Sequence, residues 1–468
     1  MSYKYKEVPL RTRIYAGLGS FGLNVIAGLF SAWTLTFYIK IVELNPLLWA
    51  FSWLSYLIWN AINDPVFGFL SDRTNTRFGR RIPYLIFCGP LLSVSFVLLY
   101  STPLNSQQWV YFIWLVITLV SYDSFFTIVS INFNSLIIEL TIHPQERAKI
   151  NFFTGVGGGF GVAIAYVLPI LFLNYELVPF SLNRPIFLAI VLLLASIGAA
   201  SIAITAFGIK EPRELIPEKS EKLKLWFSTK KTLQNKAFLT FVIFNFVMTY
   251  VVYAIQSNLP FYMGDILNIS TDNLLASIPL LLFLMFSLVG YPIGLWLNKR
   301  RGNKRATFFL SILVILGFLL VMFSNNIILA NFSFIILGLG YSGQTLLVPT
   351  LLGDIIDKDE LETGQRREGA YFGINALITK PAQSVSAVIS GLVFSLTGYI
   401  QDLPIGDFQP ASAIFGIKLL IGLIPAISIL LGLISLWFYP LDGITKEYKE
   451  MKKQVSLLHE QKLEKLRI

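Results

Sequence analysis

Residues 184–208 read RPIFLAIVLLLASIGAASIAITAFG, and no charged residue lies between Arg184 and Lys210. A helix of about 20 apolar residues is long enough to cross the hydrocarbon core of a bilayer. Composition points the same way, since 55% of the 468 residues are hydrophobic and only 14% are charged, against about 25% charged in soluble domains. We therefore expect an all-α membrane protein.

Similar apolar stretches recur along the whole chain. We predict twelve transmembrane helices, at residues 14–41, 46–71, 83–101, 109–138, 150–173, 184–208, 237–263, 273–297, 306–324, 328–352, 370–398 and 412–439. A polar segment separates the first six from the last six. The predicted domains are an N-terminal six-helix bundle at 1–208, a cytoplasmic central loop at 209–236, a C-terminal six-helix bundle at 237–439 and a cytoplasmic tail at 440–468. Two pseudo-symmetric bundles of this kind are typical of alternating-access carriers.

Charge predicts the orientation of these spans. Basic residues gather in the connections that follow even-numbered spans, while the connections after odd-numbered spans are mainly acidic. Basic loops stay on the cytoplasmic side of a membrane, so we expect both termini in the cytoplasm and the protein in the cell (plasma) membrane. Lys40 and Lys418 fall near the outer ends of their spans, where a long side chain is expected to snorkel to water.

Several classes of protein are excluded by residue counts. Cys88 is the only cysteine, and His143 and His459 are the only histidines, so neither a disulfide framework nor a thiolate or histidine metal site is expected. The net charge of +10 lies largely in short loops, which indicates membrane topology rather than nucleic-acid binding. We predict no enzyme activity, no cofactor and no nucleic-acid partner.

Three ionisable residues fall inside predicted spans, where a charge is costly and usually functional. They are Asp64 in span two, Asp123 in span four and Lys380 in span eleven. Asp64 and Lys380 lie at similar depth in opposite halves, so we hypothesise that they pair across a central cavity. A cation bound at Asp64 would weaken that pair and so couple ion binding to the arrangement of the halves. The alternative is a fixed structural ion pair.

Polar side chains extend from these charges along the same helix faces. On span two, Asn60 and Asp64 are four residues apart, with Asn63 beside them. The other polar positions are Asp123, Thr127, Ser130 and Asn134 on span four, and Asn375, Gln383 and Ser384 on span eleven. Hydroxyl, amide and carboxylate groups suit a hard cation or a polyhydroxylated ligand. The alternative is hydrogen bonding between helices. We predict that Asp123, Ser130, Asn134, Asn375 and Gln383 bind the solute.

Charged segments at the predicted cytoplasmic ends indicate a gate. One follows span two, and the other is a predicted loop directly after span ten. The candidate gating residues are Gly68, Asp72, Arg73, Arg77, Arg80, Arg81, Asp354, Asp357, Arg366 and Arg367. Ion pairs between these segments would close the inner side while the outer side is open. The alternative is a solvated charged loop.

Five glycines open predicted span five: Gly155, Gly157, Gly158, Gly159 and Gly161. A phosphate-binding loop would need a preceding strand, which this segment lacks. Close packing against another helix is the role that we expect.

Two longer motifs carry a family resemblance. The segment Trp59–Thr74 with Arg77-Phe78-Gly79-Arg80-Arg81, and the run from Asp354 to Gly369 that leads to Lys380, resemble signatures of the major facilitator superfamily. More narrowly, they resemble the glycoside–pentoside–hexuronide:cation symporters, the family of the melibiose carrier. Lysophospholipid:sodium symporters share both motifs.

The resemblance implies the major facilitator fold and coupling to a proton or sodium ion. It implies that Asp64 is a cation-site carboxylate, that Asn63 and Thr127 are oxygen ligands and that Lys380 is the partner of Asp64. Three positions depart from the pattern. Asn60 stands where the family has an acid, Ser130 where it has a sugar-binding acid, and Gly155 where it has a basic sugar contact. Recognition of a galactoside in the manner of the melibiose carrier is therefore not expected.

The function that we predict is cation-coupled symport of a small solute, a sugar or glycoside, by a monomer in the lipid bilayer. A lysolipid or other amphipath is the alternative solute, because Phe125, Phe126, Phe133, Phe152 and Phe153 could line a more apolar cavity. A non-transporting membrane receptor or scaffold is the alternative from another class.

Overall fold

The structure is a computed structural model. It describes residues 7–72, 74, 76, 79–141, 144–172, 184–211, 231–269, 274–364, 367–401, 403 and 408–465. Within these ranges the chain is nearly all helical, and the one extended pairing is an isolated bridge between Thr76 and Gly79.

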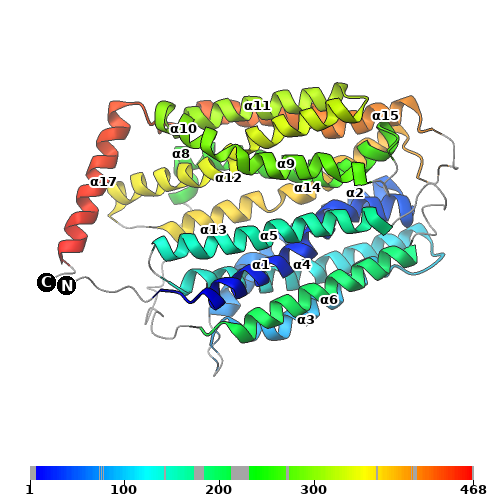
Figure 1. Cartoon of the computed structure of the whole chain (residues 1–468), viewed down its shortest axis with the longest axis horizontal. Helices are drawn as coiled ribbons and strands as arrows, with labels where there is room; N and C mark the ends of the chain where they lie inside the picture. The colour runs from blue at the N-terminus through cyan, green and yellow to red at the C-terminus, as the bar shows by residue number, and fades with distance from the viewer. Residues whose placement is uncertain are drawn as a thin grey trace. The chain divides into compact units, whose positions relative to one another are not determined.

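The helices follow the predicted spans closely (Figure 1). Those of the first part of the chain are α1 (Leu10–Thr36) with the π-turn η1 (Phe37–Ile41), α2 (Pro46–Asp72), α3 (Ile82–Tyr100), α4 (Gln108–Glu139), α5 (Pro144–Phe172) and α6 (Arg184–Gly208). Those of the second part are α8 (Lys236–Phe261) with the π-turn η4 (Tyr262–Ile266), η5 (Leu274–Ser277), α9 (Ile278–Val289), α10 (Tyr291–Arg301), α11 (Asn303–Phe323), α12 (Ile327–Thr363), α13 (Glu368–Thr379), α14 (Ala382–Thr397), α15 (Ala411–Lys418), η6 (Leu419–Leu423), α16 (Ile424–Trp437) and α17 (Lys446–Lys465).

Length and hydropathy identify the membrane spans. Among the described residues, ten helices are long and apolar enough to cross a bilayer, and the pair α9 and α10, bent by 41°, makes an eleventh. The helix at the remaining predicted position is α2, which has 27 residues but carries Asn60, Asn63 and Asp64 in its interior. All twelve predicted positions are therefore helical, and the predicted all-α fold is confirmed.

The chain forms two compact units. The first contains Met1–Lys219, Gln256–Ser277 and Ala387–Ile417, and the second contains Ser220–Ile255, Ile278–Ser386 and Lys418–Ile468. The C-terminal parts of predicted spans seven and eleven thus pack with the helices of the N-terminal half. The division of the sequence at 209–236 stays a prediction.

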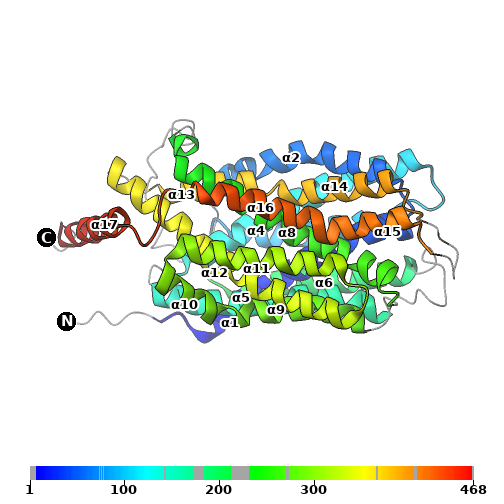
Figure 2. The same ribbon diagram turned by 90° about the horizontal axis from the view of Figure 1, so that it is seen from above.

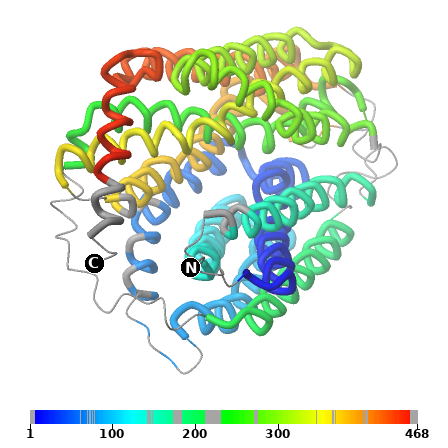
Figure 3. Tube along the Cα trace, turned by 60° about the vertical axis from the view of Figure 1, so that its left-hand side comes forward, coloured from blue at the N-terminus to red at the C-terminus, as the bar shows by residue number. Residues whose placement is uncertain are grey.

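In the first unit, α5 packs along α1 (Figure 3). Glycines make this contact close: a Cβ atom at Gly157 would lie 2.8 Å from the carbonyl carbon of Gly17, and one at Gly161 would lie 2.7 Å from the carbonyl oxygen of Phe21. The predicted packing role of the glycine-rich segment is confirmed at these two positions. Gly155 and Gly159 differ, because such an atom would meet nothing within 4 Å in the described part of the chain.

In the second unit, α11 packs against α12 and α16 (Figure 2). Ala306, Leu310 and Leu347 form a buried apolar cluster, and Gly340 lets α12 approach the backbone of Leu310. These contacts hold α12 in place beside its neighbours.

One predicted boundary is wrong. The segment after residue 352, predicted as a loop, continues α12 as a helix to Thr363. The helix ends at Gly364, whose φ of 72° suits the left-handed C-terminal position that glycine favours. Hydropathy indicates where the apolar, membrane-spanning part of a helix ends, not where the helix itself ends. A charged extension of a helix is therefore predicted as a loop.

Candidate functional site: a buried polar cluster between α2 and α4

Helix α2 places three polar side chains of the predicted cation site in the first unit. Asn63 is fully buried and Asn60 is 2% exposed, while Asp64 is half-buried. The neighbouring Trp59 donates its indole N–H to Ser124 Oγ at 3.0 Å, which attaches this turn of α2 to α4.

Helix α4 completes the cluster. The Asn63 amide donates a hydrogen bond to the Asp123 carboxylate. Asp123 is 5% exposed, and Thr127, one turn further along α4, is 3% exposed. Asp123, predicted to bind the solute, therefore contacts a residue of the predicted cation site. A carboxylate, amides and a hydroxyl gathered inside a span offer the oxygen atoms that a hard cation or a proton needs.

The next two positions of the α4 stripe are more accessible. Ser130 is half-buried and Asn134 is exposed, and the Asn134 amide donates to Ser130 Oγ at 3.4 Å. Both remain predicted solute ligands.

Lys380 lies where span eleven is interrupted. Helix α13 ends at Thr379 and α14 begins at Ala382, because Pro381 lacks the N–H that would continue the helix. Interrupted spans often form the binding sites of carriers. Lys380 and Gln383 are both half-buried. Asp64 and Lys380 belong to different compact units, and their pairing stays a prediction.

Three amides meet in the second unit. The Asn245 amide nitrogen donates to Asn375 Oδ1 at 2.9 Å, and Gln344 donates to Asn245 Oδ1 at 2.8 Å. Asn375 was a predicted solute ligand, whereas Asn245 and Gln344 were missed. Both are uncharged amides within apolar runs, and the sequence does not show that they lie beside Asn375.

Two gating arginines have partners within the first unit. Arg80 donates to Glu139 at 2.9 Å, and Arg81 lies 3.3 Å from the same carboxylate. Glu211 accepts the backbone N–H groups of Arg80 and Arg81, which fixes the turn at Gly79. The predicted pairing of these arginines with the acids after span ten stays a prediction.

The other five predicted gating residues stay predictions. Arg73, Arg77 and Arg366 lie outside the described residues, and so does the side chain of Asp72. At Gly68 a Cβ atom would meet nothing within 4 Å among the described residues.

The acids of α12 bind the C-terminal helix. Lys452 of α17 lies 2.6 Å from Asp354 and 2.7 Å from Asp357, and the Tyr448 hydroxyl donates to Asp354 at 2.9 Å. Figure 1 shows α17 at this end of α12. Burial alone would lower the pKa of Lys452, but hydrogen bonds to the two carboxylates raise it above its usual value. The ammonium group is therefore charged at neutral pH and holds the tail helix in place.

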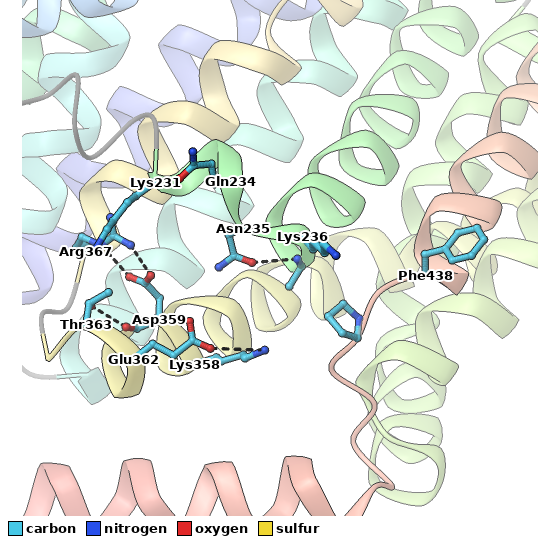
Figure 4. Close-up of a pocket in the computed structure, with 12 residues that line it drawn as sticks. Lys231, Gln234, Asn235, Lys236, Lys358, Asp359, Glu362, Thr363, Arg367 and Phe438 are labelled. Carbon is cyan, nitrogen blue, oxygen red and sulfur yellow. Dashed lines mark hydrogen bonds and ion pairs between the residues drawn. The ribbon is translucent and has the colours of Figure 1, made fainter.

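Asp359 binds Arg367 at the edge of a cavity of about 670 Å³ (Figure 4). The guanidinium group makes two hydrogen bonds to the carboxylate, and this contact raises the pKa of Arg367. Lys231, Lys236 and Lys358 also line the cavity. The pair ties the end of α12 to the start of α13.

Comparison with known proteins agrees with the fold. Residues 15–443 match the family model described as MFS/sugar transport protein. The isoprimeverose transporter of Lactiplantibacillus pentosus is 24% identical over 442 residues, with 93% of this chain and 90% of that protein covered. The sodium-dependent lysophosphatidylcholine symporter 1 of Xenopus tropicalis is 24% identical over 460 residues, with 91% and 85% covered.

A solved structure shows the same architecture. The crystal structure of a D-xylose–proton symporter superposes with a TM-score of 0.65 at 14% identity, covering 92% of this chain and 98% of that one. At this identity the likeness establishes the fold alone. Together with the family match across most of the chain, it leads to one conclusion. The chain belongs to the MFS/sugar transport family of the major facilitator superfamily, whose members include the glycoside–pentoside–hexuronide:cation type of symporter.

Proposed function

We propose that this chain carries a sugar or glycoside across the cell membrane together with a proton or sodium ion, as a monomer with both termini in the cytoplasm. The observation that carries the proposal is the buried contact between Asn63 and Asp123, directly beside Asp64. A buried carboxylate inside a span is costly unless it serves binding, and this cluster supplies several oxygen atoms at one place.

Asp123 supplies a second acid for the cation site. The sequence pattern leaves Asn60 where related symporters carry an acid, so Asp64 alone would give one negative charge. Asp123 on α4 contacts the residue next to Asp64 and is 5% exposed. Two carboxylates attract a sodium ion more strongly than one, and either of them can hold a proton. Asn63, which touches Asp123, links the two positions.

Coupling then depends on Lys380. When the cation leaves Asp64, the carboxylate regains its negative charge and attracts the ammonium group of Lys380. When the cation binds, that attraction weakens. The equilibrium between the two arrangements of the carrier changes only by the difference in free energy between these states, so removing either charge should uncouple ion and solute movement.

A group of amides in the second unit supports a hydroxylated solute. The amides of Asn245, Gln344 and Asn375 form one hydrogen-bonded group, and amides are suited to sugar hydroxyls as donors and acceptors. Of the aromatic residues that favoured an amphipath, Phe133 is 5% exposed and packs against Gly19, while Phe152 is 67% exposed. These two side chains give no support for an apolar solute cavity.

The test uses purified protein and three probes: isoprimeverose, a methyl glucuronide and lysophosphatidylcholine. Thermal unfolding is measured with each probe, with and without sodium, at pH 5.5 and pH 7.5. We expect a sugar probe to raise the unfolding temperature, and the coupling ion to increase that shift. A shift with lysophosphatidylcholine alone would replace the sugar by an amphipath. Sugar uptake is then measured in proteoliposomes that contain the protein. Sugar binding without any sugar uptake would favour a receptor over a carrier.

A further inference from the structure

The surroundings of Lys40 differ from those that the sequence predicts. Lys40 was expected to snorkel to water, yet its side chain is 13% exposed and its Nζ lies 2.8 Å from Asp265 Oδ1. The other carboxylate oxygen of Asp265, which is 14% exposed, accepts the Tyr399 hydroxyl at 2.9 Å. All three residues belong to the first compact unit.

Aromatic rings enclose the ammonium group. Nζ of Lys40 lies 5.0 Å from the centre of the Phe261 ring and 6.0 Å from that of Tyr399. Phe394 packs against both rings, at 4.8 Å and 4.7 Å between centroids. A cation over aromatic faces is stabilised more strongly when water is excluded, so Lys40 is held by an ion pair and by two ring faces.

The chain positions of these residues explain why the contact matters. Lys40 lies in the π-turn that ends span one, Asp265 in the π-turn that ends the helix of span seven, and Tyr399 directly after span eleven. The ion pair thus joins residues 225 apart in the chain, one from each predicted six-helix half.

Further contacts connect the same spans beside the ion pair. Trp49 of α2 donates its indole N–H to the backbone oxygen of Ala387 at 3.0 Å, and α2 lies beside α14 in Figure 2. Gly391 lets α14 approach the start of α2 closely, since a Cβ atom at this glycine would lie 2.6 Å from the Pro46 carbonyl oxygen. The Gln401 amide donates to the Leu44 carbonyl. The contacts around Lys40 and Trp49 therefore connect spans one and two with spans seven and eleven.

We propose that Lys40, Asp265 and Tyr399 form an outer latch, which must break before the carrier can open to the outside. The proposal rests on the proposed orientation and on transport by alternating access. The solute and the coupling ion play no part in it. Opening would move Lys40 and Asp265 into water, whereas a variant that lacks one partner leaves the other charge enclosed in the closed state. Removing one charge therefore favours the open state.

The experiment measures opening without any solute. Cys88 is the only cysteine, so Cys88→Ser gives a cysteine-free background into which Ala387→Cys is introduced. Ala387 is 7% exposed and lies at the seam between α2 and α14. Intact cells are treated with a membrane-impermeant maleimide, and the labelling rate of residue 387 reports the population that is open to the outside.

We expect Lys40→Ala and Asp265→Asn each to raise the labelling rate at least tenfold, which corresponds to about 1.4 kcal/mol. The exchanged pair, Lys40→Asp with Asp265→Lys, should bring the rate back toward that of the background. Lys418→Ala is the matched control, because Lys418 also lies near an outer helix end but binds Asn325 in an exposed contact. Its labelling rate should equal that of the background.

A rate that does not change in Lys40→Ala and Asp265→Asn, or that rises equally in Lys418→Ala, would overturn the latch. Thermal unfolding of each variant shows that the protein is folded, so misfolding cannot imitate opening. The result is independent of the coupling site: a faster labelling rate supports the latch even if Asp64→Asn transports normally, and in that case only the proposed coupling fails.

Discussion

Replacing Gly157 by Ala tests how closely α1 and α5 are packed. The new methyl carbon would lie 2.8 Å from the carbonyl carbon of Gly17, whereas carbon atoms in favourable contact are about 3.5–4.0 Å apart. The carbonyl oxygen of Gly17 would lie closer still, so the helices would have to separate by about 1 Å or more, or distort. Overpacking of this kind costs about 1–3 kcal/mol.

Helix propensity acts in the opposite direction. Ala is more favourable than Gly inside a helix by about 0.8–1.0 kcal/mol. Gly155→Ala and Gly159→Ala are matched controls, since they gain the same propensity while the added methyl group meets nothing within 4 Å among the described residues. The difference between Gly157→Ala and either control therefore isolates the packing term of about 1–3 kcal/mol.

The assay is equilibrium unfolding in mild detergent, followed by tryptophan fluorescence. We expect Gly155→Ala and Gly159→Ala to match or exceed the stability of the unmodified protein, and Gly157→Ala to fall below both. Equal stability of the three variants would refute the reasoning, because it would mean that α1 and α5 do not approach as closely as the contact with Gly17 requires.

Three more outcomes follow from individual contacts. Lys452→Ala should release α17 from Asp354 and Asp357, so amide hydrogens of Lys446–Leu458 should exchange faster than in the exposed control Lys453→Ala; equal exchange in both would contradict the docking of α17. Glu146 binds Arg13 and Lys149, and hydrogen bonds from Lys149 and the Val8 backbone lower its pKa from 4.5 to about 2. A lowered acid pKa adds stability that is present in full above the usual value of 4.5 and is lost progressively as the pH falls from there to about 2. The loss of unfolding temperature in Glu146→Gln should therefore be nearly the same at pH 8 and pH 5; a loss that shrinks between pH 6 and pH 5 would oppose this. Asp123→Asn should weaken ion dependence more than solute affinity, measured as the ion concentration for half-maximal uptake, and a change in solute affinity alone would return Asp123 to the solute site.

The sequence predicted the spans well, because their positions follow from apolar length, which is a local property. The sequence-based prediction failed where a residue's environment depends on residues far away in the chain, and where a helix continues beyond its apolar segment. Lys40 was predicted to reach water, since nothing near it in the sequence indicates Asp265, 225 residues away. The extension of α12 was missed because its residues are charged, although they are helical up to Gly364.

The candidate site was also predictable only in part, because the sequence shows which residues are charged but not which of them are in contact. An isolated charge in a span can be recognised from the sequence, which therefore predicts Asp64, Asp123 and Lys380 as candidate site residues. Which residues touch depends on how the helices pack, so the contact between Asn63 and Asp123 could not be foreseen. Asn245 and Gln344 carry no charge and became informative only once Asn375 was seen beside them.

The most direct test of the coupling claim follows ion and solute movement together. Proteoliposomes containing the unmodified protein or Asp64→Asn receive the sugar probe that stabilises the purified protein, and sodium or proton entry is recorded at the same time as sugar entry. We predict that sugar drives ion entry through the unmodified protein, and that Asp64→Asn shows no sugar-driven ion entry and no accumulation against a gradient. Sugar-driven ion entry of equal size through Asp64→Asn would contradict the account.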